Sequence, residues 1–215
     1  FNGAIYQEKW DNAQAGIFAP QLGFPNLTAT TNGPNYEVKG VEMSIVAAPL
    51  DGLTIQAAGS YNKGELKNSP VFTVNAPGNP NQGDVITDSC LIYDTSTSTC
   101  LQSVSVENVF GTPGTPMAFS PELQWNIRAR YEWAMGDYQP FVSGAVQYQD
   151  DSWSAASEAL RWKQPSWTTM DASVGLAKDD WNAELYVINL TDENKSLFTN
   201  NWQFIPVEVP MRPRT

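Results

Sequence analysis

The chain has 215 residues, of which 41% are hydrophobic, 12% aromatic and only 16% charged, and its formal net charge is −11. This acidic balance, with only 12 Lys and Arg residues, disfavours nucleic-acid binding because phosphate contacts require basic side chains. The sequence contains no His, which excludes Ser-His-Asp triads, Cys-His pairs and His-ligated zinc.

Six segments alternate apolar and polar residues with a period of two, which is typical of β-strands whose two faces meet different surroundings. No helical period competes over a comparable length, and no apolar run approaches the roughly 20 residues of a transmembrane helix. In chain order, these segments lie at 41–48, 53–62, 123–133, 142–149, 169–176 and 181–187, and residues 1–6 also read like the middle of a strand.

The segment 123–133 shows this alternation most clearly. One face is wholly apolar, whereas the other is polar and includes Arg128, Arg130 and Glu132. Eleven residues at about 3.3 Å each reach about 36 Å, and a tilt of about 45° reduces this height to about 25 Å. That height matches the apolar band of an outer-membrane β-barrel. The apolar face consists of Leu123, Trp125, Ile127, Ala129, Tyr131 and Trp133.

The connections between the predicted strands alternate between long and short. In an up-and-down barrel, this order places every short turn at one end and every long loop at the other, as in outer-membrane barrels. A soluble β-sandwich gives no reason for such sorting. We therefore predict an all-β fold, an antiparallel up-and-down transmembrane β-barrel. The short turns lie at 49–52, 135–137 and 178–180, and the long connections at about 12–35, 64–121, 151–166 and 194–210.

The two cysteines, Cys90 and Cys100, lie in the second long connection, separated by a stretch rich in Ser and Thr. An even number of cysteines in a polar loop favours a disulfide formed in an oxidising compartment, and two free thiols are the alternative. Such a bond would stabilise the fold by about 2–3 kcal/mol if its geometry is unstrained.

Four short motifs follow one another along the chain. They are KGVE at 39–42, PLDGLT at 49–54 leading to GSY at 59–61, NLTD at 189–192 and PRT at 213–215. In this order and spacing they resemble the late barrel strands of TonB-dependent outer-membrane receptors. Residues 1–14 are similar to the strand that precedes KGVE in that family. The resemblance covers essentially the whole chain.

The resemblance implies that residues 1–215 are the C-terminal portion of a 22-stranded barrel, contributing seven or eight strands without the N-terminal plug or the final strand. It also implies uptake of a scarce nutrient across the outer membrane of a Gram-negative cell. The implied substrates are an iron–siderophore complex, cobalamin or an oligosaccharide, with energy supplied by the TonB complex through the missing plug. Outer-membrane lipid and a small extracellular ligand are the other expected partners. We expect no cofactor, no metal and no enzymatic activity.

Loop aromatics and wall arginines are the candidate site residues. Trp153 and Trp162, in the third long connection, are candidates for stacking on a sugar or an aromatic siderophore. Anchoring at the membrane interface is the alternative. Arg128 and Arg130 should face the lumen and contact the plug or an anionic ligand, unless they are solvated or paired wall residues. Trp167, beside a strand start, is expected in the interfacial aromatic belt.

Two other classes of protein are compatible with the alternation. A small complete outer-membrane barrel with a structural or adhesive role would need an even number of strands and a closing aromatic strand. A soluble carbohydrate-binding β-sandwich would need inward faces that are apolar on both sheets, rather than a polar face that contains arginines.

Overall fold

The computed structural model describes residues 1–18, 28–70, 88–94, 96–97, 99–105, 110–156, 161–200 and 207–215. Every regular element over these residues is a β-strand, so the predicted all-β class is confirmed. In this part of the chain, no helix is long and apolar enough to cross a lipid bilayer.

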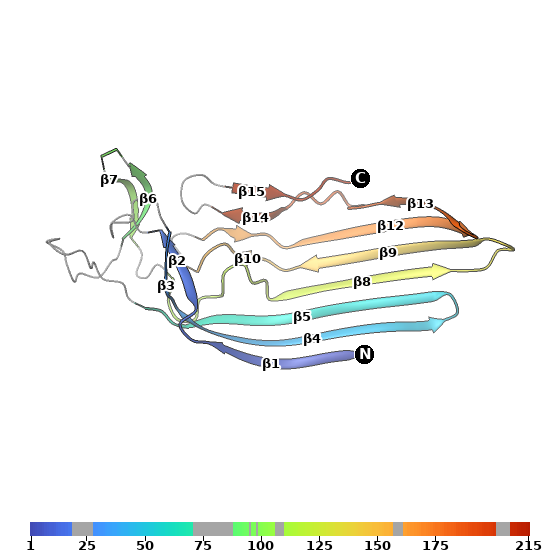
Figure 1. Ribbon diagram of the computed structural model, residues 1–215, viewed down its shortest axis with the longest axis horizontal. Coiled ribbons are helices and arrows are strands. Elements are labelled where there is room, and N and C mark those ends of the chain that lie inside the picture. Colours follow the sequence, from blue (N-terminus) through green and yellow to red (C-terminus); the bar gives the residue numbers. More distant parts are fainter. Residues whose placement is uncertain are drawn as a thin grey trace.

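Seven long strands form one antiparallel sheet, in the order β1-β4-β5-β8-β9-β12-β13. Each strand of the sheet pairs with the sheet strand that precedes it along the chain, which makes an up-and-down meander (Figure 1). This arrangement confirms the predicted antiparallel up-and-down topology. The strands are β1 (Asn2–Trp10), β4 (Asn35–Leu50), β5 (Leu53–Asn68), β8 (Leu123–Glu132), β9 (Gln139–Gln149), β12 (Trp167–Lys178) and β13 (Trp181–Val187).

Each of the four long connections contains a two-stranded hairpin, which the sequence analysis did not predict. In Figure 1, β2, β3, β6 and β7 lie at the left-hand end of the sheet, and the turns β4–β5, β8–β9 and β12–β13 lie at the right-hand end. We call these the hairpin end and the short-turn end. The hairpins pair β2 (Gln14–Phe18) with β3 (Thr28–Asn32), β6 (Asp88–Asp94) with β7 (Thr99–Ser105), β10 (Ser152–Trp153) with β11 (Lys163–Gln164), and β14 (Ser196–Asn200) with β15 (Val207–Pro210).

Strands β4 and β5 have 16 residues each and extend well beyond the predicted segments 41–48 and 53–62. At about 3.3 Å per residue, each reaches about 53 Å, which is more than a tilted strand needs to cross an apolar band of about 25 Å. The additional residues lie at the hairpin end, where Glu37, Lys39 and Lys63 interrupt the apolar pattern. Apolar periodicity alone therefore misses these parts of both strands.

The sheet has one apolar and one polar face. Ile5, Val41, Tyr61 and Leu123 form one row across β1, β4, β5 and β8, because residues opposite each other in register share a face. This apolar face is strongly exposed, with Ile5 at 85% and Leu185 at 73% of their full accessibility. An exposed apolar surface of this extent marks contact with lipid or with another apolar partner.

Among the described residues, most of the few buried apolar side chains lie on the polar face. At the hairpin end, Val38 and Leu66 are buried. Near the short-turn end, Phe141 is buried beneath the guanidinium of Arg130, whose central carbon lies 3.6 Å from the ring centroid. Position 175 is a glycine on the neighbouring strand, where a side-chain carbon would overlap the Phe141 ring. Arg130 is therefore part of a packing unit as well as a wall residue.

The glycine of the KGVE motif also has a packing reason. The Tyr6 side chain crosses Gly40 and donates a hydrogen bond to Oδ1 of Asn62 on β5. A Cβ at position 40 would lie 2.5 Å from both the Tyr6 ring and this oxygen. Only a glycine lets this hydrogen bond connect β1 and β5 across β4.

The NLTD and PRT motifs lie against each other. Asn189 is 3% exposed, and its Nδ2 donates hydrogen bonds to the carbonyls of Glu193 at 2.8 Å and Arg212 at 2.9 Å. The backbones of Ile188 and Thr215 exchange two hydrogen bonds, at 2.8 and 3.2 Å. The C-terminal residues are thereby held alongside the segment that follows β13.

Candidate ligand-binding site

The β10–β11 hairpin carries an aromatic and basic cluster. Trp153 lies opposite Lys163 in register, and the guanidinium carbon of Arg161 lies 4.1 Å from the centroid of the Trp153 ring. Nζ of Lys163 lies 5.8 Å from the same ring and 2.9 Å from Oδ2 of Asp151. The electron-rich face of an indole attracts cations, so these contacts hold both basic groups beside the ring.

Backbone hydrogen bonds fix the position of this hairpin. Ser154 N–H donates to the Trp162 carbonyl at 2.9 Å, and Trp162 N–H donates to Ser154 Oγ at 2.8 Å. Phe119 N–H donates to the Trp153 carbonyl at 2.7 Å, which attaches the hairpin to the connection that precedes β8. The Trp153 side chain is therefore presented from a hydrogen-bonded support.

The two predicted tryptophans point to opposite sides of the hairpin. Trp153 lies opposite Lys163 and Trp162 opposite Ser154, and adjacent residues of an extended chain alternate in direction. Trp162 is 41% exposed. A ligand on the Trp153 side would meet the basic groups, whereas a ligand on the Trp162 side would meet a different surface.

Arg128 and Arg130 lie on the polar face of β8, towards the short-turn end. Nε of Arg130 lies 3.2 Å from Oε2 of Glu132, and its guanidinium covers Phe141. The Arg128 side chain is exposed and forms no ion pair or hydrogen bond with any residue that the structure describes. The two arginines therefore differ, since the Arg130 side chain has an ion pair and a ring contact, whereas that of Arg128 has neither an ion pair nor a hydrogen bond with the described residues.

The two groups of predicted residues are far apart. Arg130 lies opposite Ser143, and β9 continues for six more residues to Gln149 before the hairpin begins. At about 3.3 Å per residue, this separation is about 20 Å for Arg130 and about 13 Å for Arg128, which lies opposite Ala145, so the arginines and the hairpin lie at different heights of the sheet. The structure instead brings Arg161 and Lys163 to Trp153. Neither residue was predicted from the sequence, although the run RWK at 161–163 is the signal that points to them.

A hollow of about 390 Å³ lies on the polar face and extends from β1 to β9. It offers hydrogen-bonding groups and a single carboxylate, which suits a polar ligand or a polar protein surface. Across the described ranges, no group of three or more His, Cys, Asp or Glu side chains could hold a metal ion. The polar side chains of its lining include Asn2, Glu42, Ser60, Gln124, Asn126 and Gln147.

The prediction for Trp167 is wrong. Trp167 lies opposite Gln149 on the polar face and is 8% exposed, so it is not part of an aromatic belt on the apolar face. Trp167 and Asp171 are four residues apart on β12. Because side chains alternate along a strand, an even separation places both on the same, polar face. No described residue accepts a hydrogen bond from its indole N–H. Trp125, by contrast, lies on the apolar face and stacks on Tyr148 with ring centroids 5.7 Å apart.

The predicted disulfide concerns side chains outside the described part of the structure. The backbone register of β6 and β7 places Cys90 opposite Ser103 and Cys100 opposite Tyr93. The disulfide between Cys90 and Cys100 stays a prediction.

The turn of the β6–β7 hairpin contains a strongly perturbed carboxyl group. Oδ1 of Asp94 accepts hydrogen bonds from Ser96 Oγ at 2.6 Å and from Ser96 N–H at 2.8 Å. These bonds favour the ionised form and lower the pKa of Asp94 to about 2. The group is a turn former and stays charged at neutral pH.

A family model described as TonB dependent receptor-like, beta-barrel matches residues 1–190. Among solved structures, the chain is similar to the ferric yersiniabactin uptake receptor FyuA from Yersinia pestis, with a TM-score of 0.65 and 14% identity over 99% of this chain and 25% of that one. The siderophore receptor PiuA and the ferric preacinetobactin receptor BauA, both from Acinetobacter baumannii, give TM-scores of 0.61 and 0.59 at 15% and 13% identity. These matches cover 99% of this chain and 24% and 25% of PiuA and BauA, so the chain spans about a quarter of their length. No curated protein matches the chain in sequence.

Proposed function

Because this chain belongs to the TonB-dependent receptor-like β-barrel family, we propose that it forms part of the barrel wall of an outer-membrane receptor in a Gram-negative cell. The exposed apolar face, with Ile5 at 85% and Leu185 at 73% accessibility, is the observation that carries this proposal, since lipid is the partner that covers such a face. In this orientation the polar face lines the lumen. The hairpin end faces the outside, and the short-turn end faces the periplasm.

We further propose that the receptor takes up a negatively charged iron–siderophore complex with energy from TonB. Three structures of similar fold are a siderophore receptor and two receptors for ferric siderophores. In this chain, Trp153 supplies an aromatic face, and Arg161 and Lys163 supply positive charge beside it. An uncharged oligosaccharide would gain little from those two cations. The family consists of transport receptors, so we propose no catalytic role.

Site-directed variants of the full-length receptor that contains this chain test the ligand proposal. Trp153→Ala should weaken binding of an anionic ferric siderophore about 2- to 30-fold, because a cation–aromatic cluster of this kind contributes about 0.5–2 kcal/mol. Trp162→Ala is the matched control, since it removes the same side chain from the opposite side of the hairpin. Binding is measured on purified receptor by intrinsic fluorescence quenching. If Trp153→Ala and Trp162→Ala weaken siderophore binding equally, the proposal that the ligand binds on the Trp153 side of the hairpin is contradicted.

A transport assay tests the dependence on TonB. Cells whose only siderophore receptor is this protein should bind radiolabelled ferric siderophore with or without TonB, but should internalise it only with TonB. Uptake that is unchanged after deletion of TonB would reject energised transport and favour a passive or adhesive barrel.

We propose that Arg128 contacts the plug rather than the ligand. The exposed position of Arg128 on the polar face near the short-turn end supports this role. Arg128→Ala should leave siderophore affinity within about twofold and should change the rate of TonB-dependent uptake. A loss of affinity as large as that of Trp153→Ala would instead make Arg128 a ligand contact.

A further inference from the structure

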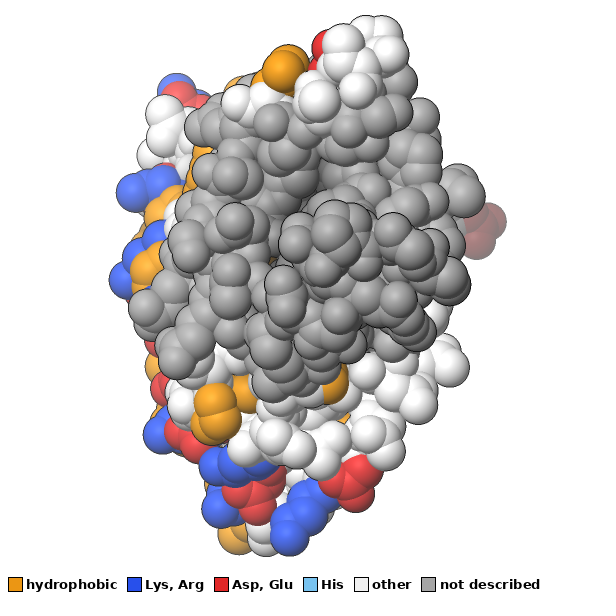
Figure 2. Space-filling model, turned by 90° about the vertical axis from the view of Figure 1, so that its left-hand side faces the viewer, with side chains coloured by type: hydrophobic (Ala, Val, Ile, Leu, Met, Phe, Trp, Pro, Cys, Tyr) orange, Lys and Arg blue, Asp and Glu red, His pale blue; other side chains and the backbone are white. Residues whose placement is uncertain are grey.

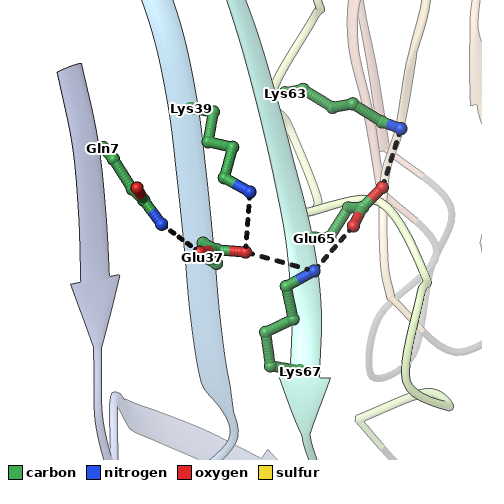
Figure 3. A network of polar contacts seen from close by, with 6 residues as sticks. All are labelled: Gln7, Glu37, Lys39, Lys63, Glu65 and Lys67. Atoms are coloured by element: carbon green, nitrogen blue, oxygen red, sulfur yellow. Dashed lines mark hydrogen bonds and ion pairs between the residues drawn. The ribbon is translucent and has the colours of Figure 1, made fainter.

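A second charged surface lies on the apolar face, at its border with the hairpin end. Lys39 and Glu37 continue the alternation of Val41, and Lys63 and Glu65 continue that of Tyr61, so these charged side chains share the apolar side of β4 and β5. We call this group the lysine cluster. As Figure 3 shows, its members on β1, β4 and β5 are Gln7, Glu37, Lys39, Lys63, Glu65 and Lys67.

Two glutamates hold the three lysines of the cluster in place. Oε2 of Glu37 lies 3.4 Å from Nζ of Lys39 and 3.3 Å from Nζ of Lys67. The two carboxylate oxygens of Glu65 lie 2.8 Å from Nζ of Lys63 and 2.9 Å from Nζ of Lys67. This continuous chain of ion pairs sets the spacing of the three ammonium groups (Figure 3).

The ammonium groups are the outermost part of the cluster. The three lysine side chains are 45–61% exposed, whereas those of Glu37 and Glu65 are only 14% and 28% exposed. Lys9 lies opposite Glu37 in register, so four of the seven lysines in the sequence gather here. Three glutamates lie among them, because the Glu122 carboxylate accepts a hydrogen bond from the Tyr61 hydroxyl at 3.3 Å and attracts Lys63. The cluster therefore has a surplus of one positive charge, in a chain whose net charge is −11. Figure 2, which views the molecule from the hairpin end, shows charged side chains along its left and lower margins.

A groove of about 670 Å³ connects the lysine cluster to the apolar band. Ile5, Val41 and Tyr61 line its apolar part, and Lys39 and Lys63 line its charged part. Val41 and Tyr61 are both 46% exposed, and Ile5 is 85% exposed, so the apolar part is open. An occupant of this groove meets hydrocarbon and ammonium groups at the same time.

We propose that this groove binds a phosphorylated, acylated lipid of the outer leaflet, with an acyl chain along Ile5 and Val41 and a phosphate against Lys39 and Lys63. The inference rests on the proposed function, because it takes the apolar face to contact lipid. Charge complementarity identifies the phosphate: an ammonium group has three donor hydrogens, and each of these two lysines forms an ion pair with only one glutamate. A soluble anion would leave the apolar half of the groove unused.

Native mass spectrometry of the full-length receptor in detergent tests the proposal, with bisphosphorylated lipid A, monophosphorylated lipid A and phosphatidylethanolamine as probes. The double variant K39Q/K63Q should bind bisphosphorylated lipid A at least tenfold more weakly than the unmodified receptor. The control K178Q/K195Q makes the same change in charge at lysines outside the cluster and should bind normally. K39R/K63R keeps the charge and should also retain binding, which separates loss of the phosphate contact from misfolding.

Several outcomes would overturn the inference. If K39Q/K63Q and K178Q/K195Q bind bisphosphorylated lipid A equally well, Lys39 and Lys63 do not contribute to the lipid site. Equal binding of all three lipids would show a general lipid surface without phosphate recognition. Displacement by millimolar inorganic phosphate would identify a free anion as the occupant. Ferric-siderophore uptake is measured separately, in the unmodified receptor and in K39Q/K63Q. If uptake is normal but the unmodified receptor does not bind lipid A, only the lipid proposal is rejected. Absence of uptake in the unmodified receptor would reject the proposed function instead.

Discussion

At the scale of single residues, the clearest constraint is Gly40, over which the Tyr6 ring passes to reach Asn62. Gly40→Ala should destabilise the barrel by about 1–3 kcal/mol, because the new methyl group overpacks against the ring and the amide oxygen. The measurement is the denaturant midpoint of unfolding of the full-length receptor in detergent.

Gly144 provides the matched control for this substitution. A Cβ at Gly144 would meet only the Asp171 carbonyl oxygen at 3.7 Å, which is an ordinary contact. Gly144→Ala should therefore change stability by less than about 0.5 kcal/mol. The double variant Y6A/G40A should recover part of the stability that the methyl group costs in G40A, because it lacks the Tyr6 ring with which that methyl group would overlap. Similar midpoints for G40A and G144A would argue against the packing explanation.

Asp94 gives a residue-scale prediction about pH. Its folded pKa of about 2 lies below the usual 3.8 because Ser96 donates two hydrogen bonds to the ionised carboxylate. A lowered pKa means that the turn is stabilised at pH values above about 4, and that this contribution is lost as the pH falls through about 2. Ser96→Ala should raise the pKa of Asp94 towards 3.8. The ¹³C signal of the carboxylate, assigned with Asp94→Asn, reports the titration, and an unchanged curve in Ser96→Ala would contradict this cause.

At the scale of elements, the NLTD and PRT motifs act as one clasp. The Asn189 side chain donates to the carbonyls of Glu193 and Arg212, and its backbone N–H donates to Oδ1 of Asp171 at 2.9 Å. Asp171 of β12 is thereby bound to the segment that follows β13. Arg214 N–H adds a bond to the Asp192 carboxylate at 3.1 Å. In the sequence the two motifs are separate segments, whereas in the fold hydrogen bonds connect them.

Asn189→Ala should release the clasp. It removes two side-chain hydrogen bonds to carbonyls, each contributing about 0.5–1.5 kcal/mol, and places alanine at a φ of 56° that asparagine tolerates better. Hydrogen exchange should become faster at residues 188–195 and 211–215. Asn189→Gly tolerates the backbone conformation but lacks the side chain, so it should lose most of the same protection. Full protection in Asn189→Gly would show that the backbone conformation, rather than the side-chain bonds, holds the clasp.

Period-two alternation predicted the sheet strands well because their two faces meet media of opposite polarity. It failed where that contrast ends. In the extensions of β4 and β5, the charged side chains around Glu37 and Lys63 replace the apolar ones on one face, and Val38 and Leu66 are buried on the other. Strands β3 and β7 are rich in small polar residues. Strand pairing there depends on backbone hydrogen bonds and turn geometry, which do not produce a clear pattern of apolar residues in the sequence.

The candidate site was predictable only in part. Residue type and loop position singled out Trp153, but its contact with Arg161 and Lys163 depends on the hairpin register, which the sequence analysis did not predict. The pairing of Arg130 with Phe141 was equally hidden, because the other residues that β9 places on the polar face are small or carry amides. Contacts across strands are set by register, and register is not visible in any one segment.

At the scale of the whole molecule, the two faces of one sheet account for most of the chain's composition. Apolar residues on one face and amides, hydroxyls and charges on the other give a chain that is 41% hydrophobic yet contains only a handful of fully buried side chains among the residues described. A soluble domain of this length would instead bury its apolar residues in a common core. The arrangement stabilises the fold only when a second medium covers the apolar face.

Neighbouring residues on β8 make this whole-molecule arrangement testable. Ile127 lies on the apolar face and Arg128 on the polar face, so a spin label at each position samples opposite sides of the wall. In receptor reconstituted into lipid bilayers, with Cys90 and Cys100 replaced by Ser, Ile127→Cys should be relaxed mainly by oxygen, which concentrates in hydrocarbon. Arg128→Cys should be relaxed mainly by a water-soluble nickel complex. The same contrast is expected between Met170→Cys and Asp171→Cys on β12, which has the same alternation and serves as an independent strand. Strong relaxation by nickel at both members of each pair would place both faces in water and would reject a membrane wall, because a lipid-covered face excludes the ion.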